Sequence, residues 1–265
     1  APVMQTNLNT FGALAIYLDQ TPALALDLNA TCDDLQEALD TTLAGEDAQP
    51  YLDALDALRN AAQAHQEEIA AINAQYQDAL DEKADQQTLD EIRERGRALN
   101  AKTLDAFRFV QEQFIGIIST SDIVIKHVAY QNNVDVIEGV IAALEEGVLS
   151  NEEGSGALDL AWMINGGAEY GYYSFSTETN AASLASLQEE SNPGNLFWGT
   201  DKGSVLAQTY PATVSLLEKA ESEDGDFAEE IAVYAKEQAQ QERYLQEMIR
   251  QETDAMQELT QMLGA

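Results

Sequence analysis

The sequence predicts an all-α protein: an elongated helical bundle with long, coiled-coil-like antiparallel helices and a cap rich in Gly, Tyr and Trp. Two long stretches place apolar residues at alternating spacings of three and four, the period of a helix face that packs against other helices. A third segment, 166–203, breaks this pattern with glycines and aromatics. Aromatic, Ser and Thr residues alternate at 172–177 and permit a short β-hairpin there.

The first periodic stretch predicts a helix over Tyr51–Leu80. Its apolar seam persists for about four heptads, with polar residues on the other faces. Pro50 stands near the start, where the missing N–H of proline costs least. The seam consists of Leu55, Leu58, Ala62, His65, Ile69, Ile72, Tyr76 and Ala79.

A turn at Asp81–Gln86 and a further helix over Gln87–Ile118 complete a predicted helical hairpin. Gly96 lies on the inner face of the second helix, where we expect it to permit the close approach of another helix. Beyond Leu104 the apolar stripe widens, which predicts burial on more sides. Ser119–Asp122 should end this helix or cap the next.

The second seam predicts a helix that begins near Asp224 or Asp226 and runs almost to the end of the chain. Three polar residues, Gln238, Gln241 and Glu252, interrupt its apolar positions. Polar residues at such positions weaken a helical interface but can fix its register and its number of partners. We therefore expect these three residues to take part in interactions.

Shorter helices are expected elsewhere, and the composition changes at Gly166. The chain then reads as a helical bundle (1–165), an aromatic and glycine-rich cap or loop (166–204) and helices that return to the same bundle (205–265), all in one domain. The shorter helices are expected at 7–19, 31–43, 133–149, 155–165 and 205–220.

The net charge of −34, from 47 acidic and 13 basic residues, indicates the kind of solvent in which the protein works. A folded chain of 28.9 kDa should expose roughly 11,000 Å², so one uncompensated negative charge falls on every ~330 Å². This self-repulsion opposes compactness and is relieved by salt. We expect the protein to work at high salt or in a saline exterior. The alternative is that its acidic surface serves only to keep it soluble. The charge argues against nucleic-acid binding and against anionic membranes, so the expected partners are diffuse cations, other protein subunits or copies of the chain.

The motifs of common catalytic sites are absent from the sequence. His65 and His127 lack the spacings of di-iron and zinc sites. The single cysteine, Cys32, cannot form an intrachain disulfide, and its acidic neighbours predict a raised thiol pKa. Nucleophile-elbow, dinucleotide and P-loop patterns are missing as well. We predict no enzymatic activity, no cofactor and no metal site, and we interpret both histidines and the cysteine as structural.

The cap is the remaining candidate interaction site. Tyr and Trp combine apolar area with a polar tip and dominate binding hot spots. The alternative is that these aromatics form a small core beneath the cap. The residues concerned are Tyr170, Tyr172, Tyr173, Phe197 and Trp198.

The leading hypothesis is a non-enzymatic exported structural or interaction protein, a subunit of an extracellular, surface, appendage or virion assembly in a saline environment. One alternative is an extracytoplasmic ligand- or cation-binding helical protein whose cap closes on the ligand. Another is a pore-forming or membrane-remodelling protein that inserts 107–128, but the charges in that segment argue against it, and no stable membrane span is expected. The start Ala-Pro-Val fits a removed signal peptide and an extracellular or surface location; the cytoplasm of a salt-accumulating halophile is the alternative.

Overall fold

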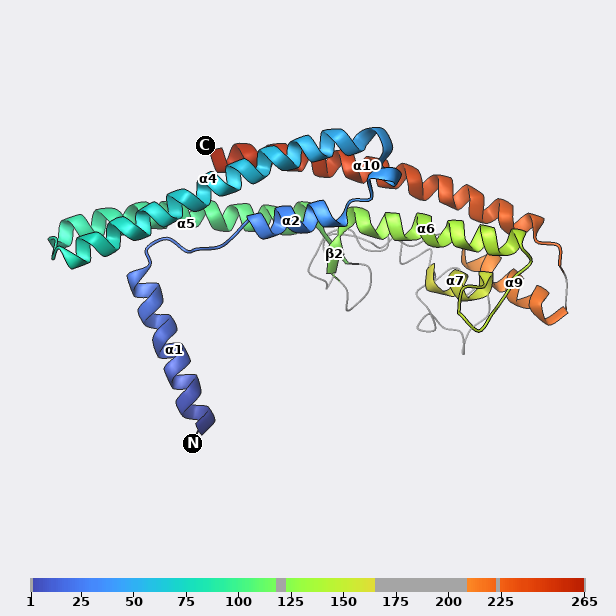
Figure 1. Ribbon diagram of the computed structural model, residues 1–265, viewed down its shortest axis with the longest axis horizontal. Coiled ribbons are helices and arrows are strands. Elements are labelled where there is room, and N and C mark those ends of the chain that lie inside the picture. Colours follow the sequence, from blue (N-terminus) through green and yellow to red (C-terminus); the bar gives the residue numbers. More distant parts are fainter. Residues whose placement is uncertain (1, 118–122, 165–208, 223–224, 265) are drawn as a thin grey trace. The chain divides into compact units, whose positions relative to one another are not determined.

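The computed structural model describes residues 2–117, 123–164, 209–222 and 225–264. Over these residues the protein is all-α, as predicted, apart from one small pair of strands and a 3-10 turn at Gly45–Asp47 (Figure 1). The helices are α1 (Pro2–Gln20), α2 (Asn29–Ala38), α3 (Thr41–Ala44), α4 (Ala48–Asp81), α5 (Gln86–Gln113), α6 (Lys126–Glu145), α7 (Ala157–Ile164), α9 (Tyr210–Ser222) and α10 (Ala228–Gly264). The predicted cap, 166–204, including the hairpin expected at 172–177, lies outside the described residues.

The chain divides into two compact units, which are described separately. Unit 1 comprises residues 1–37, 52–110 and 253–265, and unit 2 comprises residues 38–51 and 111–252. The long helices α4, α5 and α10 each contribute residues to both units.

Unit 1 is built on the predicted hairpin of α4 and α5, whose antiparallel course is visible in Figure 1. The turn lies where it was expected, and Asp85 caps α5 by accepting hydrogen bonds from the backbone N–H and the hydroxyl of Thr88, both at 2.8 Å. All eight seam residues of α4 are buried. The hairpin core contains Ile69, Ile72, Tyr76, Ala79, Ile92 and Leu99, and it includes Ala23 from the N-terminal segment.

The predicted extension of α5 to Ile118 is wrong. The helix ends at Gln113, and the chain continues into β1 (Ile115–Ile117), which pairs antiparallel with β2 (Ile123–Ile125). Gly116 disfavours a helix, and the β-branched residues Ile115 and Ile117 on either side of it favour a strand. Phe114 is fully buried beside this pair, and its carbonyl accepts the backbone N–H of Lys126 at 2.9 Å. As a result α6 begins at Lys126, earlier than the helix predicted from residue 133.

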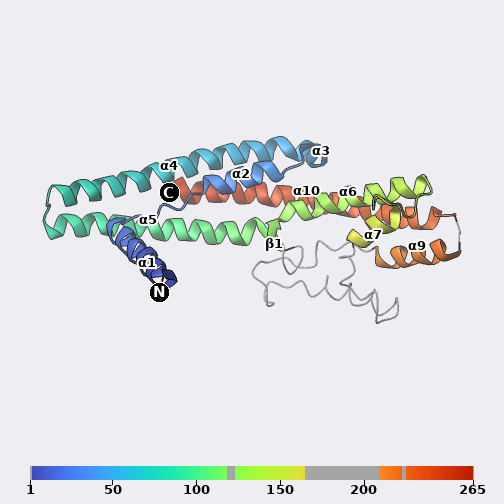
Figure 2. The same ribbon diagram turned by 60° about the horizontal axis from the view of Figure 1, so that its bottom comes forward.

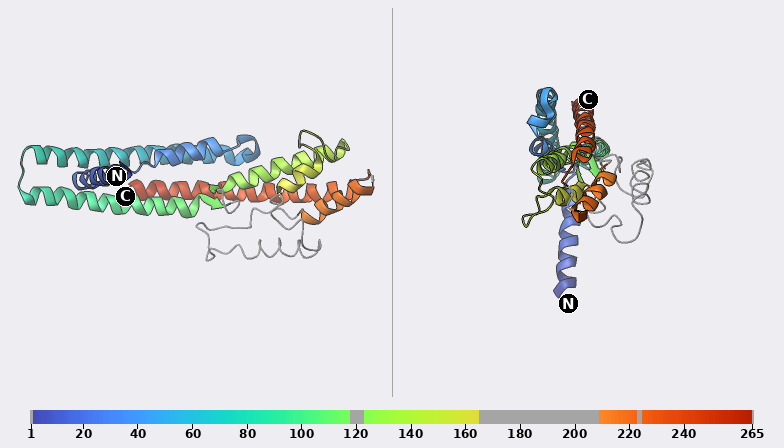
Figure 3. Two further views of the ribbon diagram at one scale, coloured as in Figure 1. Left: turned by 90° about the horizontal axis from the view of Figure 1, so that it is seen from below. Right: turned by 90° about the vertical axis from the view of Figure 1, so that its right-hand side faces the viewer.

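Unit 2 has its core where α6, α7, α9 and the first half of α10 meet (Figure 2 and Figure 3). The pair of helices expected over 133–149 and 155–165 corresponds to α6 and α7, and the helix expected over 205–220 corresponds to α9. The buried core residues are Ile137, Val140, Ala143, Leu144, Ala157, Ala161, Ile164, Ala212, Leu216, Phe227 and Tyr234. In the same unit, Gln241 and Glu252 of α10 contact α6.

Candidate functional site

The five aromatic residues proposed as an interaction site, Tyr170, Tyr172, Tyr173, Phe197 and Trp198, lie outside the described residues. Their role stays a prediction. The three polar positions of α10 are described, and all belong to unit 2.

Gln241 is fully buried in unit 2 and is hydrogen-bonded at both ends of its amide. Its Nε2 donates to Glu237 Oε1 at 2.8 Å, one turn earlier in α10. Its Oε1 accepts a hydrogen bond from Asn133 Nδ2, on α6, at 3.0 Å. Gln238 is only half-buried. The polar position at Gln241 is therefore satisfied by this chain's own α6.

Glu252 is buried to 1% exposure and accepts hydrogen bonds from three donors. The backbone N–H of His127 reaches Oε1 at 3.2 Å, and His127 Nδ1 lies 2.7 Å from Oε2. The hydroxyl of Tyr51 donates to Oε2 at 3.3 Å, and the Tyr51 ring stands edge-on to the imidazole at 5.7 Å. A carboxylate, which only accepts hydrogen bonds, satisfies all three of these neighbours when the imidazole proton is on Nδ1.

The imidazole of His127 is fully enclosed, and its Nε2 has no hydrogen-bond partner among the described residues. The Glu252 and Gln241 contacts both join α10 to α6 inside unit 2. They fix the register of the two helices, which is the role expected of polar residues in an apolar seam. This internal use accounts for both buried residues without a second chain.

His65 occupies a comparable buried position in unit 1. Its Nε2 lies 2.8 Å from Thr103 Oγ1, and that hydroxyl donates its own proton to the carbonyl of Leu99 at 2.9 Å. The ring must therefore donate from Nε2, and the acceptor Nδ1 has no hydrogen-bond partner within the described part of the chain. Burial, together with the charge of Lys102, lowers the pKa of His65, so the neutral ring is favoured. The arrangement supports the structural interpretation.

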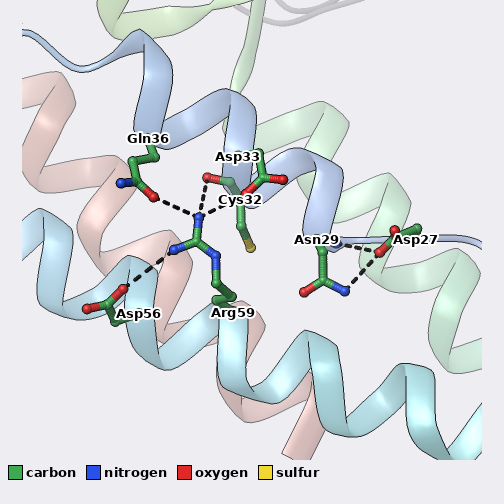
Figure 4. A network of polar contacts seen from close by, with 7 residues as sticks. All are labelled: Asp27, Asn29, Cys32, Asp33, Gln36, Asp56 and Arg59. Carbon is green, nitrogen blue, oxygen red and sulfur yellow. Dashed lines mark hydrogen bonds and ion pairs between the residues drawn. The ribbon is translucent and has the colours of Figure 1, made fainter.

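Cys32 lies in the interface of α2 with α4, where Arg59 makes a network of polar contacts (Figure 4). Burial raises the pKa of the thiol to about 11, and the acidic neighbour Asp33 adds to this. Arg59 Nη2 donates to Gln36 Oε1 at 2.8 Å, to Asp33 Oδ1 at 3.1 Å and to the Cys32 carbonyl at 3.5 Å, while Nη1 lies 3.6 Å from Asp56. The guanidinium thus fastens α2 to α4, and burial together with the raised pKa disfavours the reactive thiolate of Cys32.

A feature that the sequence analysis missed is a pair of asparagines facing the segment Thr21–Leu28, which we call the strap. Asn73, on α4, accepts the N–H of Ala23 at 3.0 Å and donates to the Ala23 carbonyl at 2.8 Å. Asn100, on α5, accepts the N–H of Leu24 at 2.6 Å and donates to the Pro22 carbonyl at 3.0 Å. These two amides, the backbone clamp, hold the strap between the helices of the hairpin.

Gly96 makes room for the strap, and the expectation that it admits another helix is wrong. A Cβ atom at Gly96 would lie 2.5 Å from the carbonyl oxygen of Pro22. Ala23, the central residue, is fully buried in the hairpin core. The only signals in the sequence were Asn73 beside the seam residue Ile72 and a glycine on the inner face of α5.

Five large apolar residues in the C-terminal half of α1 are exposed. Phe11 and Ile16 are 68% and 61% exposed, and Leu14, Tyr17 and Leu18 are each at least 47% exposed. Residues 1–18 contain no Asp, Glu, Lys or Arg, in a chain with a net charge of −34. Exposed apolar side chains in an uncharged stretch of an acidic protein make α1 a candidate interaction surface.

No protein-family model, curated protein or solved structure matches the chain. Within the described ranges, no group of His, Cys, Asp and Glu side chains could hold a metal ion. None of the described helices is long and apolar enough to cross a membrane.

Proposed function

We propose that this protein is a non-enzymatic structural subunit of an assembly in saline surroundings, exported to the cell exterior or to a cell or virion surface. The observation that carries the proposal is the exposed, uncharged apolar surface of α1. We assign to that helix the contact between copies of the chain.

Most of the exposed apolar side chains of α1 share one face. Phe11, Leu14 and Leu18 follow the spacing of three and four that defines a helix face, and Tyr17 lies at its edge, whereas Ile16 projects from the opposite side. An apolar helix face of this kind is normally covered by another element. Burying a large apolar side chain contributes about 1.5–3 kcal/mol, so covering the exposed halves of five contributes on the order of 5 kcal/mol per chain.

The distribution of charge supports contact between copies through this helix. Two chains that each carry −34 repel one another over most of their surfaces. The α1 helices, uncharged up to Asp19, can meet without that repulsion. Salt screens the remaining charge over distances of about 3 Å at 1 M, so association should strengthen as salt increases.

A lipid surface is the competing partner for an exposed apolar helix. Helices that lie in a membrane interface usually carry Lys or Arg on the polar face, which attract anionic lipids. Residues 1–18 have neither, and the rest of the chain repels such lipids. These observations favour a protein partner.

The test is the solution mass of the full chain between about 0.1 M and 3 M KCl, measured by light scattering. We expect several chains per particle at high salt, and one chain per particle for the double variant Phe11→Ser, Ile16→Ser. The control is Leu104→Ser on α5, which also replaces an exposed apolar residue and should keep the wild-type mass. A single-chain mass at every salt contradicts the proposal. Flotation of the wild type, but not of the double variant, with neutral vesicles would instead assign α1 to lipid.

A further inference from the structure

We propose that the backbone clamp is a binding site for an extended polypeptide segment, and that in the assembly its occupant is the strap of a second copy of the chain. The N-terminal segments of neighbouring copies would then be exchanged. This inference rests on the proposed function, because it requires copies to associate.

The clamp recognises its occupant through the peptide backbone. All four hydrogen bonds from Asn73 and Asn100 are made to backbone N–H and carbonyl groups of the strap. Among the clamped residues Pro22–Leu24, Ala23 alone is buried, and Pro22 approaches Gly96 with its carbonyl group and its Cβ atom. The site therefore requires an extended segment with a small central residue. The strap of a second copy meets this requirement with identical contacts.

The two ends of the strap differ in how firmly the chain is held. On the C-terminal side, α2 is fastened to α4 by Arg59, and Asp27 accepts the N–H of Asn29 at 2.8 Å at the start of α2. On the N-terminal side, the large apolar residues of α1 remain exposed. A tight turn, with the N–H of Leu26 donating to the Leu24 carbonyl at 2.9 Å, separates the clamped residues from α2. This turn is where the chain would change direction.

Exchange replaces each contact of the clamped residues Pro22–Leu24, on the N-terminal side of the turn, with the same contact in a neighbour. The opposing terms are the entropy of association and the repulsion between acidic chains, and salt reduces the second of these. The favouring term is the covering of the exposed α1 side chains, which are brought onto the neighbouring copy together with the strap. Exchange of an identical element is a low-cost route to association for this reason.

The experiment uses full-length chains that carry photo-leucine in place of leucine, with one half labelled with ¹⁵N. The two populations are unfolded together in urea, refolded in high salt, irradiated and analysed by mass spectrometry. Leu24, Leu26 and Leu28 supply reactive positions in the strap. We expect crosslinks between strap peptides and α4 or α5 peptides in which mixed-label pairs are as abundant as same-label pairs.

The outcomes separate the two proposals. Particles of several chains whose strap–hairpin crosslinks are all of one label would overturn the exchange and leave the assembly intact. A single-chain mass at every salt would overturn both.

Two variants test the site directly. Gly96→Val places side-chain atoms where the Pro22 carbonyl lies, so strap–hairpin crosslinks of both kinds should be lost. The amides of Ala23 and Leu24 should also lose their protection from hydrogen exchange. Glu94→Val, at an exposed position of α5, is the control and should keep both signals. Mixed-label crosslinks that persist at wild-type abundance in Gly96→Val would refute the assignment of the clamp.

Discussion

The buried carboxylate of Glu252 provides the most quantitative test of the reasoning above. In Glu252→Leu, the backbone N–H and Nδ1 of His127 and the hydroxyl of Tyr51 lose their acceptor inside unit 2. A hydrogen bond to a charged group contributes about 1.5–3 kcal/mol, and breaking a buried pair by removing one partner costs about 3–5 kcal/mol. Since three donors are stranded in a site with 0–1% exposure, we expect a loss of about 4 kcal/mol in the free energy of unfolding.

The assay is urea denaturation followed by circular dichroism and fluorescence, at constant high salt. Urea is preferred because guanidinium chloride would change the ionic strength. Glu247→Leu, at an exposed position of α10, is the matched control and should change stability by no more than about 0.5 kcal/mol. Because Glu252 is enclosed, its effect should be the same at moderate and high salt, unlike that of surface charges.

A double-mutant cycle with His127→Leu then measures the coupling between the two residues. The double variant should lose less stability than the sum of the single losses, because it no longer strands the imidazole beside an apolar side chain. A loss for Glu252→Leu no larger than that of the Glu247→Leu control would refute the buried contact, and additive effects would refute the pairing.

Three further outcomes are expected. The pKa of His65 is lowered by burial from 6.5, so the unfolded state binds more protons at and below that pH. The neutral ring's contribution to the free energy of unfolding is therefore complete above pH 6.5 and is lost as the pH falls towards the pKa of the folded state. In urea titrations over this range, His65→Gln should lose less stability than the wild type. Because the pKa of Cys32 is about 11, its thiol should not react with a disulfide reagent at about pH 8 until urea unfolds the chain, and rapid reaction in the native state would contradict the burial of the thiol. Leu216→Ala opens a cavity in a fully buried position of unit 2 and should cost about 2–5 kcal/mol of unfolding free energy, whereas an unchanged urea midpoint would contradict the α9 packing.

Helical periodicity in a sequence identifies the face of a helix that is buried, and this face was predicted for the long helices. Every residue of the α4 seam is buried because a spacing of three and four keeps one face of a helix inward wherever the partner lies. The same signal could not locate the end of α5, since the apolar run through Ile115 and Ile117 is compatible with a helix or a strand, and pairing with Ile123–Ile125 decided the outcome.

The polar contacts depended on long-range packing and could be predicted only in part. The interruption of the second seam pointed to Gln241 and Glu252, but their partners Asn133 and His127 are more than a hundred residues away in the sequence. The backbone clamp was harder to predict from the sequence, because asparagines on long polar helices are ordinary surface residues. What makes Asn73 distinctive is the strap that lies against it, and no local pattern describes that contact.

The two polar contacts between α6 and α10 also bear on how unit 2 would respond to mechanical load. A force along the axis of α10 tends to slide the helix past α6. Apolar side chains alone would resist this movement weakly, because each would meet a similar apolar neighbour after the helix had moved. Sliding by one turn, about 5.4 Å, would pull Gln241 from Asn133 and Glu252 from His127 together. The load is therefore shared by two separated contacts that must fail at once, whereas peeling the helices apart from one end breaks them in succession. Unit 2 should therefore resist shear between α6 and α10 more strongly than their separation from one end.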